Sequence, residues 1–287
     1  MRQLWYFDTL MARPQGRAIM LKNSITIYNN LRNKVYRIYH HLNLERHENT
    51  KGRKLKISLI DSIALVLFKQ RQKIQTKKSL FEMSTVACVY KTFVESLNRV
   101  AQSLARIIGA VLTINRQSSH LVKHTDATDI PVCLNKNAWN HKTMSQLSAW
   151  SKTGKGWFYG LKLHLTSDLN GKILALRFTS ANSDDRQVCR EMNDKLRGLF
   201  VADAGDISRE LEQDFFIENE RAIFIIPRAN LKKLATTLGV WLLNTRMKVE
   251  VNFRNLKLFF GLLTSLPRSI DGYLANYLSS VLAYLIA

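Results

Sequence analysis

A change of periodicity near residue 121 limits how this chain can fold. Before it, apolar side chains recur every three or four residues, as they do on amphipathic helices. After it, three segments, 121–134, 157–166 and 173–179, read as strands; in the second, apolar and polar side chains alternate regularly. The run Asp168-Leu169-Asn170-Gly171 between the last two is typical of a hairpin turn. The sequence therefore predicts an antiparallel meander of three strands.

Helical and strand patterns alternate after this meander. The expected order is helix 184–197, strand 199–203, helix 208–219, strand 222–227 and helix 242–260. Short strands separated by helices form parallel pairs. Three antiparallel strands followed by this alternation are the order of a ribonuclease H-like domain. The expected fold class is therefore α/β, with a mixed sheet and flanking helices.

The N-terminal part is expected to be entirely helical and basic. Helical patterns cover 23–43, 57–70, 77–82 and 90–113, and a polar, positive stretch at 44–56 predicts a linker. A short helix, a turn and a longer basic helix are compatible with a helix-turn-helix, although any small helical bundle gives the same pattern. The expected domains are a basic helical region with its linker (1–55), a helical DNA-binding domain (56–119) and a catalytic domain (120–287).

The charge of the chain favours a polyanionic partner. The formal net charge is +21, and residues 1–120 alone hold 21 basic and 6 acidic side chains. Ribosomal and membrane-surface proteins share such a charge, but nucleic acid is the better interpretation. Lys91 and Arg99, in the 90–113 helical pattern, are the candidate DNA contacts there. The apolar segment 273–287 is too short to span a membrane and predicts a core helix, so a soluble cytoplasmic protein is expected.

Three carboxylates stand where they can meet. Asp126 lies inside an apolar strand, where an ionised side chain is normally paired or bound to a metal. Asp203 ends the apolar run 199–202, and Glu250 lies on the helix that follows. Ligands of such sheets gather near the carboxyl ends of adjacent strands. Hard carboxylate oxygens suit Mg²⁺, and two such ions can activate and stabilise the oxygens of a phosphodiester during its cleavage.

Two cations accompany Glu250 on its helix. Arg246 and Glu250 are four residues apart and Lys257 follows seven residues later, so all three lie near one face. This spacing alone favours an ordinary surface ion pair with a nearby lysine. The other interpretation places both cations on DNA phosphates next to a metal-binding carboxylate.

Several motifs closely resemble DDE transposases of bacterial insertion sequences. They are TDATDIPVC (125–133), GWFYGLKLH (156–164), ANSDDR (181–186), FVADAG (200–205), NTRMKVE (244–250) and LPRS (266–269). The resemblance covers about residues 55–287. It implies that Asp126, Asp203 and Glu250 are the catalytic acids and metal ligands, holding two Mg²⁺ ions for which Mn²⁺ can substitute.

The same resemblance implies a function and partners. A transposase of this kind cleaves DNA at the ends of its insertion sequence and transfers the freed strands into target DNA. The expected partners are terminal inverted repeats and target DNA, with a homodimer or larger assembly on DNA, in the nucleoid of a bacterial cytoplasm. Related transposases carry Y-x2-R-x3-E-x6-K, which Arg246, Glu250 and Lys257 match. This match favours DNA contact, rather than a surface ion pair, as the role of Arg246 and Lys257.

Two positions depart from the family pattern. Leu243 stands where the tyrosine is usual, and Asp206 stands where an aromatic residue usually follows the glycine. Asp206 is expected to cap helix 208–219 rather than bind metal. Asp129, three residues from Asp126, is expected on the opposite face of the strand. Asp129 and Asp206 would therefore at most contact the metal-binding side chains without binding the metal themselves.

Some interpretations stay open at this point. A catalytically inactive, DNA-binding relic or repressor, and a ribonuclease H-like nuclease acting on other nucleic acid, are the alternative functions. His141 and His164 are expected to be packed or surface groups rather than ligands. Three tryptophans are either core residues or platforms for an extruded base, and the sequence does not decide between these roles: Trp139, Trp150 and Trp157.

Overall fold

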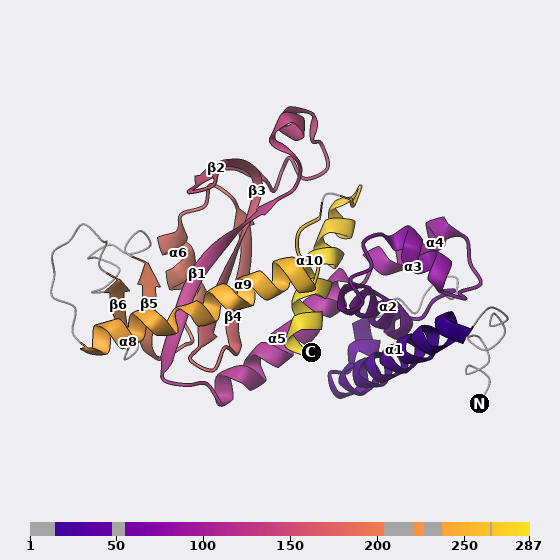
Figure 1. Ribbon diagram of the computed structural model, residues 1–287, viewed down its shortest axis with the longest axis horizontal. Coiled ribbons are helices and arrows are strands. Elements are labelled where there is room, and N and C mark those ends of the chain that lie inside the picture. Colours follow the sequence, from indigo (N-terminus) through magenta and orange to yellow (C-terminus); the bar gives the residue numbers. More distant parts are fainter. Residues whose placement is uncertain (1–14, 48–54, 204–220, 227–236, 265) are drawn as a thin grey trace. The chain divides into compact units, whose positions relative to one another are not determined.

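The computed structural model describes residues 15–47, 55–203, 221–226, 237–264 and 266–287 (Figure 1). It divides into two compact units. Unit 1 comprises Met1–Gly109, Leu258–Leu262 and Leu266–Ala287, and unit 2 comprises Ala110–Lys257 and Leu263–Ser265. No helix among the described residues is long and apolar enough to cross a membrane.

Unit 1 is helical. Its elements are α1 (Gln15–His41), η3 (Leu44–His47), α2 (Leu59–Arg71), α3 (Lys77–Met83), α4 (Tyr90–Asn98), the first half of α5 (Ala101–Gln117) and α10 (Ile270–Leu285). The C-terminal helix expected from residue 273 is α10, which the sequence division grouped with residues 120–287 and which packs against α2 and α4 in unit 1.

Helix α2 is the centre of unit 1. Every residue from Ser62 to Gln70 is buried, which explains why this helix is apolar on nearly all sides. Ser58 caps its first turn by accepting a hydrogen bond from the Asp61 amide, and the Asp61 carboxylate accepts one from Arg32 of α1. At the other end Gln70 donates to Asn276 of α10. These contacts attach α1 and α10 to the central helix.

Unit 2 is built on a mixed six-stranded sheet. The strands are β1 (Val122–Pro131), β2 (Ala149–Thr153), β3 (Gly156–Asp168), β4 (Ile173–Ser180), β5 (Gly198–Asp203) and β6 (Arg221–Ile226). Their order is β2-β3-β1-β5-β6, with β4 also paired to β3. Strand β3 is antiparallel to β1, β2 and β4, whereas β1–β5 and β5–β6 are parallel. The predicted mixed sheet is confirmed.

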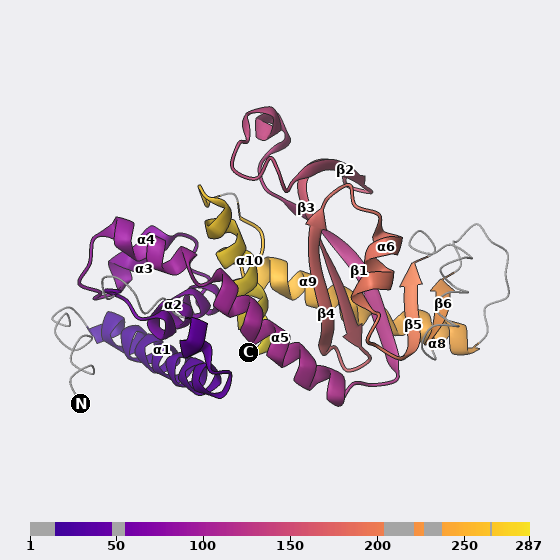
Figure 2. The ribbon, with the colours of Figure 1, turned by 180° about the vertical axis from the view of Figure 1, so that it is seen from behind.

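Helices cover both faces of this sheet. Figures 1 and 2 show α6 (Asp185–Met192) on one face and α8 (Thr237–Thr245) with α9 (Met247–Phe259) on the other. The alternation along β5 matches these layers, because Phe200 and Ala202 pack in a cluster with α6 residues while Val201 packs with Leu242 of α8. An α/β/α sandwich therefore forms around the strand that carries Asp203.

Several element boundaries differ from the expected ones. The helix expected over 90–113 is two helices, α4 and α5, which are separated at Arg99 and Val100. Strand β2 and the short helix η4 (Asn135–Asn140) were not predicted from the sequence. The helix expected over 208–219 lies outside the described residues.

The helix expected over 242–260 is also two helices, α8 and α9, which meet at Arg246. The Thr245 hydroxyl donates to the Leu242 carbonyl, and the Val249 amide bonds the Arg246 carbonyl three residues back. These local bonds replace the regular ladder of a single helix at the junction. The break therefore lies four residues before Glu250.

Candidate active site

Two of the predicted acids lie on the neighbouring parallel strands β1 and β5. Their parallel register pairs Val122 with Leu199 and His124 with Val201, which is an offset of 77 positions. Asp126 and Asp203 are separated by the same offset, and each lies two residues beyond the last pair of this register, His124 and Val201. The side chain of Asp203 lies outside the described residues.

A glycine fixes the start of this register. Gly198 begins β5 with φ +109, a conformation that favours glycine, and a Cβ there would lie 2.4 Å from the Leu121 carbonyl oxygen. The Leu199 amide also bonds that carbonyl. The close approach at Gly198 thus fixes where the pairing of β1 with β5 begins.

Asp126 faces the layer formed by α8 and α9. Along β1, Val122, His124 and Asp126 share one face, and Val122 belongs to the cluster that contains Leu242 of α8. The Asp126 side chain is 19% exposed, and its Oδ1 accepts a hydrogen bond from the Ala127 amide. A largely buried carboxylate here requires a cation.

Arg246, at the junction of α8 and α9, supplies that cation. Its Nη2 lies 3.4 Å from Asp126 Oδ2, and its Nε lies 4.0 Å from Glu250 Oε1. The Arg246 side chain is 24% exposed and the Glu250 side chain 59% exposed. The structure thus brings Asp126 and Glu250 to one arginine, although 124 positions separate them in the sequence.

The pKa of Asp126 reflects this crowding. Burial raises it above the ordinary value of an aspartate, and the charge of Glu250 adds to the rise, whereas Arg246 and the Ala127 amide lower it. The two carboxylates therefore interact unfavourably, and a further cation between them would relieve the repulsion.

A second pair of charges lies next to the first. Lys257 Nζ of α9 donates to Asp129 Oδ1 at 3.0 Å, and both side chains are mostly buried. Burial raises the pKa of Asp129, but the hydrogen bond and charge of Lys257 outweigh it, and the net pKa lies below the usual range. Strand alternation predicts that Asp129 lies on the opposite face from Asp126, yet Lys257 of α9 reaches it.

His124 is a functional candidate that the sequence reasoning missed. Its ring is buried, and Nε2 lies 2.9 Å from the hydroxyl oxygen of Thr245. Because Thr245 donates its own hydrogen to the Leu242 carbonyl, Nε2 must donate. Burial lowers the His124 pKa to about 4, so the ring is neutral and attaches the end of α8 to β1. Its position two residues before Asp126 was the available signal.

The donor set suits a hard divalent cation. Asp126 and Glu250 offer carboxylate oxygens, and the buried, raised-pKa Asp126 gains from added positive charge. Within the described residues no three Asp, Glu, His or Cys side chains form a ready metal cluster. A third carboxylate at the level of residue 203 would complete one.

The other predicted residues fall into three groups. Asp206 lies outside the described residues, as does the side chain of Leu243. Lys91 and Arg99 are exposed in unit 1, on α4 and at its end, and their DNA contacts remain a prediction. Asp184 caps α6. Of the two histidines, His164 is buried against Thr179 and His141 packs on Tyr159. Of the three tryptophans, Trp139 and Trp157 are exposed and Trp150 is partly buried.

Comparisons with known proteins show a family and a similar fold. The family model described as "Transposase DDE domain" matches residues 116–269, more than half of the chain. Among solved structures, the piggyBac transposase in its synaptic complex with hairpin DNA matches with a TM-score of 0.50 and 11% sequence identity, covering 91% of this chain and 74% of that one. That likeness concerns the fold. A comparison with curated proteins found no significant match.

Proposed function

Because the chain belongs to the family of transposases with a DDE domain, we propose that it cleaves DNA at the ends of a mobile element and joins the freed 3′-hydroxyls to target DNA. Transposases of this family use divalent metal ions, and the proposed ion here is Mg²⁺, with Mn²⁺ as a substitute. The catalytic acids of the proposal are Asp126, Asp203 and Glu250.

One observation carries the proposal. Asp126 of β1 and Glu250 of α9 converge on Arg246, and Asp203 ends β5, the strand that pairs in parallel with β1 over residues 122–124. An ordinary surface ion pair between Arg246 and Glu250 would not include a buried carboxylate from the middle of a central strand. Such a strained cluster of like charges is typical of functional sites.

The residues of the cluster have distinct proposed roles. The three carboxylates hold two divalent ions, which would supply positive charge to the scissile phosphate and to the attacking and leaving oxygens. Arg246 balances Asp126 and Glu250 in the structure, and its guanidinium is suited to bind a phosphate oxygen once the carboxylates bind metal. His124 positions the end of α8, and with it Arg246, by donating to Thr245.

Lys257 has a proposed role next to the cluster. Lys257 lies about two turns after Glu250 along α9, and Asp129 accepts a hydrogen bond from its ammonium group. In this position the lysine would lie along the path of a DNA strand whose phosphate is bound at Asp126. Because the pairing with Asp129 already restricts the Lys257 side chain, the lysine would lose less conformational entropy on binding DNA. It also keeps a basic group beside the acids when no DNA is bound.

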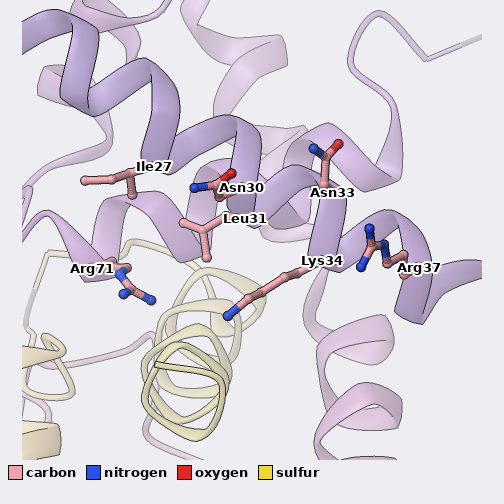
Figure 3. A pocket seen from close by; sticks show the side chains of 7 residues that line it. All are labelled: Ile27, Asn30, Leu31, Asn33, Lys34, Arg37 and Arg71. Carbon is pink, nitrogen blue, oxygen red and sulfur yellow. The ribbon is translucent and has the colours of Figure 1, made fainter.

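Unit 1 offers a basic surface for gripping DNA. A pocket of about 350 Å³ is lined by Ile27, Asn30, Leu31, Asn33, Lys34, Arg37 and Arg71 (Figure 3). The lining contains three cations, two amides and no acid, and α1 carries no acidic residue along its length. Figure 3 shows the charged ends of Lys34 and Arg71 directed to the same side. We propose that this pocket receives a backbone phosphate of the element end.

Single-turnover cleavage tests the proposal. The substrate is a DNA fragment that carries the gene with its natural flanks, incubated with Mg²⁺. Asp126→Asn, Asp203→Asn and Glu250→Gln should each abolish cleavage and leave DNA binding intact, because each removes a metal ligand and no phosphate contact. Asp271→Asn, an exposed aspartate of α10, is the matched control and should cleave normally.

The outcome separates the alternative functions. A wild-type chain that binds the fragment and never cleaves it would be a relic or repressor. Cleavage that ignores the element ends would indicate a general nuclease. Near-normal cleavage by any one of the three acid variants would remove that residue from the site.

A further inference from the structure

A hairpin face in unit 2 combines aromatic rings with lysines. Directly opposed residues of β2 and β3 share one face of the hairpin, and the register opposes Trp150 to Tyr159 and Lys152 to Trp157. Trp139 of η4 joins this face, with its ring centre 6.4 Å from that of Trp150. We call Trp139, Trp150, Trp157 and Tyr159 the aromatic face; none of them has a role in the site described above.

Two rings of the aromatic face are open to solvent, whereas Trp150 is partly buried and Tyr159 is buried. Trp139 is 87% exposed and Trp157 60% exposed, although both are among the largest apolar side chains of the chain. The Trp150 ring lies 5.6 Å from the Tyr159 ring, tilted by 56°. In Figure 1 the loop after β1 and the β2–β3 hairpin project from the rest of the sheet, so the face lies on an arm of unit 2.

The arm is basic and lacks acids. No Asp or Glu occurs between Asp129 and Asp168, and three of the five tryptophans of the chain fall in that interval. Four exposed lysines of the arm form no ion pair with any described residue: Lys136, Lys142, Lys152 and Lys155. The charge of Lys155 also lowers the pKa of Asp129, so the tip of the hairpin is within electrostatic range of Asp129.

A purely structural role explains only part of the aromatic face. The Trp150–Tyr159 pair stabilises the hairpin, as aromatic cross-strand pairs commonly do by about 0.5–1.5 kcal/mol. Trp139 and Trp157, in contrast, bury too little surface to contribute much to the fold. Exposed rings interleaved with cations are instead the composition of surfaces on which unpaired bases stack.

We propose that the aromatic face binds a DNA strand with unstacked bases, the rings stacking on bases and the lysines following the phosphates. The proposal rests on the transposase function and adds a substrate contact to it. Tyr159 is next to Gly160, which pairs with Pro131, and Pro131 follows Asp129 by two residues. At about 3.3 Å per residue the face begins about 10 Å along β1 from the level of Asp129. A strand cut at Asp126 therefore reaches it within a few nucleotides.

Binding of a labelled, mixed-sequence single-stranded DNA to the full chain tests this proposal. Trp139→Ala and Trp157→Ala should each weaken binding about tenfold, the loss typical of one base–aromatic stack. Trp241→Ala, a half-exposed tryptophan of α8, is the matched control and should bind as the wild type does. An abasic strand of equal length should bind the wild type and both arm variants alike, because it has phosphates and no bases.

The results that would overturn the proposal are distinct. Unchanged affinity in the double variant Trp139→Ala/Trp157→Ala, or an equal loss of affinity for the abasic strand, would exclude base stacking. A changed oligomeric state in that variant, with unchanged DNA affinity, would show that a second copy of the chain covers the face. Cleavage by the wild type is measured in parallel. Failure of the transposase proposal would appear as absent wild-type cleavage, whereas failure of the aromatic-face proposal would appear only in the DNA affinities of the variants.

Discussion

Replacing Arg246 with alanine should both destabilise unit 2 and reveal the charge strain in the site. The Nη2–Oδ2 distance of 3.4 Å to Asp126 corresponds to about 5 kcal/mol at an effective dielectric constant of about 20, and to about 1 kcal/mol in bulk water. Because both side chains keep some exposure and Glu250 is more than half exposed, we expect a loss of about 2 kcal/mol. For a unit of this size that loss lowers Tm by about 4–8 °C.

The pH dependence of this loss is the specific signature. Arg246 lowers the pKa of Asp126, so in Arg246→Ala that pKa rises further above its ordinary value. The pair stabilises the fold only while the carboxylate is ionised, so its contribution is present at high pH and disappears as pH falls through the raised pKa. The difference in Tm between variant and wild type should therefore be largest near pH 8 and narrow towards about pH 4.

Thermal melting across that pH range measures the effect. Arg254→Ala, which removes an exposed arginine of α9, is the control and should change Tm little at any pH. A Tm difference for Arg246→Ala that is absent at pH 8, or equally large at every pH, would refute the reasoning.

Three further predictions follow from the same contacts. Asp126→Asn should have a higher Tm than the wild type at neutral pH, because the raised pKa of Asp126 means that its ionised form destabilises the fold. The Tm values of variant and wild type should converge in acid, where the wild-type carboxyl is protonated, and equal Tm values at neutral pH would contradict this. Lys257→Ala should slow single-turnover cleavage at least about tenfold, whereas Lys248→Ala, exposed on the same helix, should cleave normally. Lys34→Gln/Arg71→Gln should reduce the slope of log affinity for the element end against log salt by about 2, and Lys78→Gln should leave it unchanged.

The order of elements was predictable because their periodicities are strong. Strand β3 alternates cleanly, and the apolar run before Asp203 is bounded by a glycine, so both appeared close to their observed positions. The break at Arg246 was hidden, since the apolar pattern continues across it and a threonine hydroxyl ends α8. Strand β2 was missed because its five residues, with Lys152 among them, are only partly buried or exposed and give no apolar pattern.

The site was predictable in composition and only partly in geometry. Spacing and family resemblance identified Asp126 and Glu250, which the structure brings to a shared arginine. No periodicity shows that Arg246 forms an ion pair with Asp126 as well as with Glu250, or that Lys257 reaches Asp129. These contacts depend on how α9 packs against β1. Tertiary packing of this kind is set by the whole unit and not by a local pattern.

The division of the chain also depends on long-range packing. Helix α10 contacts α2 through Gln70 and Asn276, 206 positions apart, so a fragment of residues 1–120 would lose part of the core of unit 1. Any assay of DNA binding by unit 1 therefore requires the full chain with point substitutions. A truncated N-terminal fragment would test folding as much as recognition.

Metal-directed backbone cleavage tests the three-carboxylate site most directly. Fe²⁺ bound in place of Mg²⁺ and treated with ascorbate produces hydroxyl radicals, which cut the polypeptide next to the metal. The expected fragments end near residues 126, 203 and 250, and excess Mg²⁺ should suppress all three cuts together. Cuts near 126 and 250 without one near 203, or cuts that Mg²⁺ does not suppress, would contradict a shared metal site at Asp126, Asp203 and Glu250.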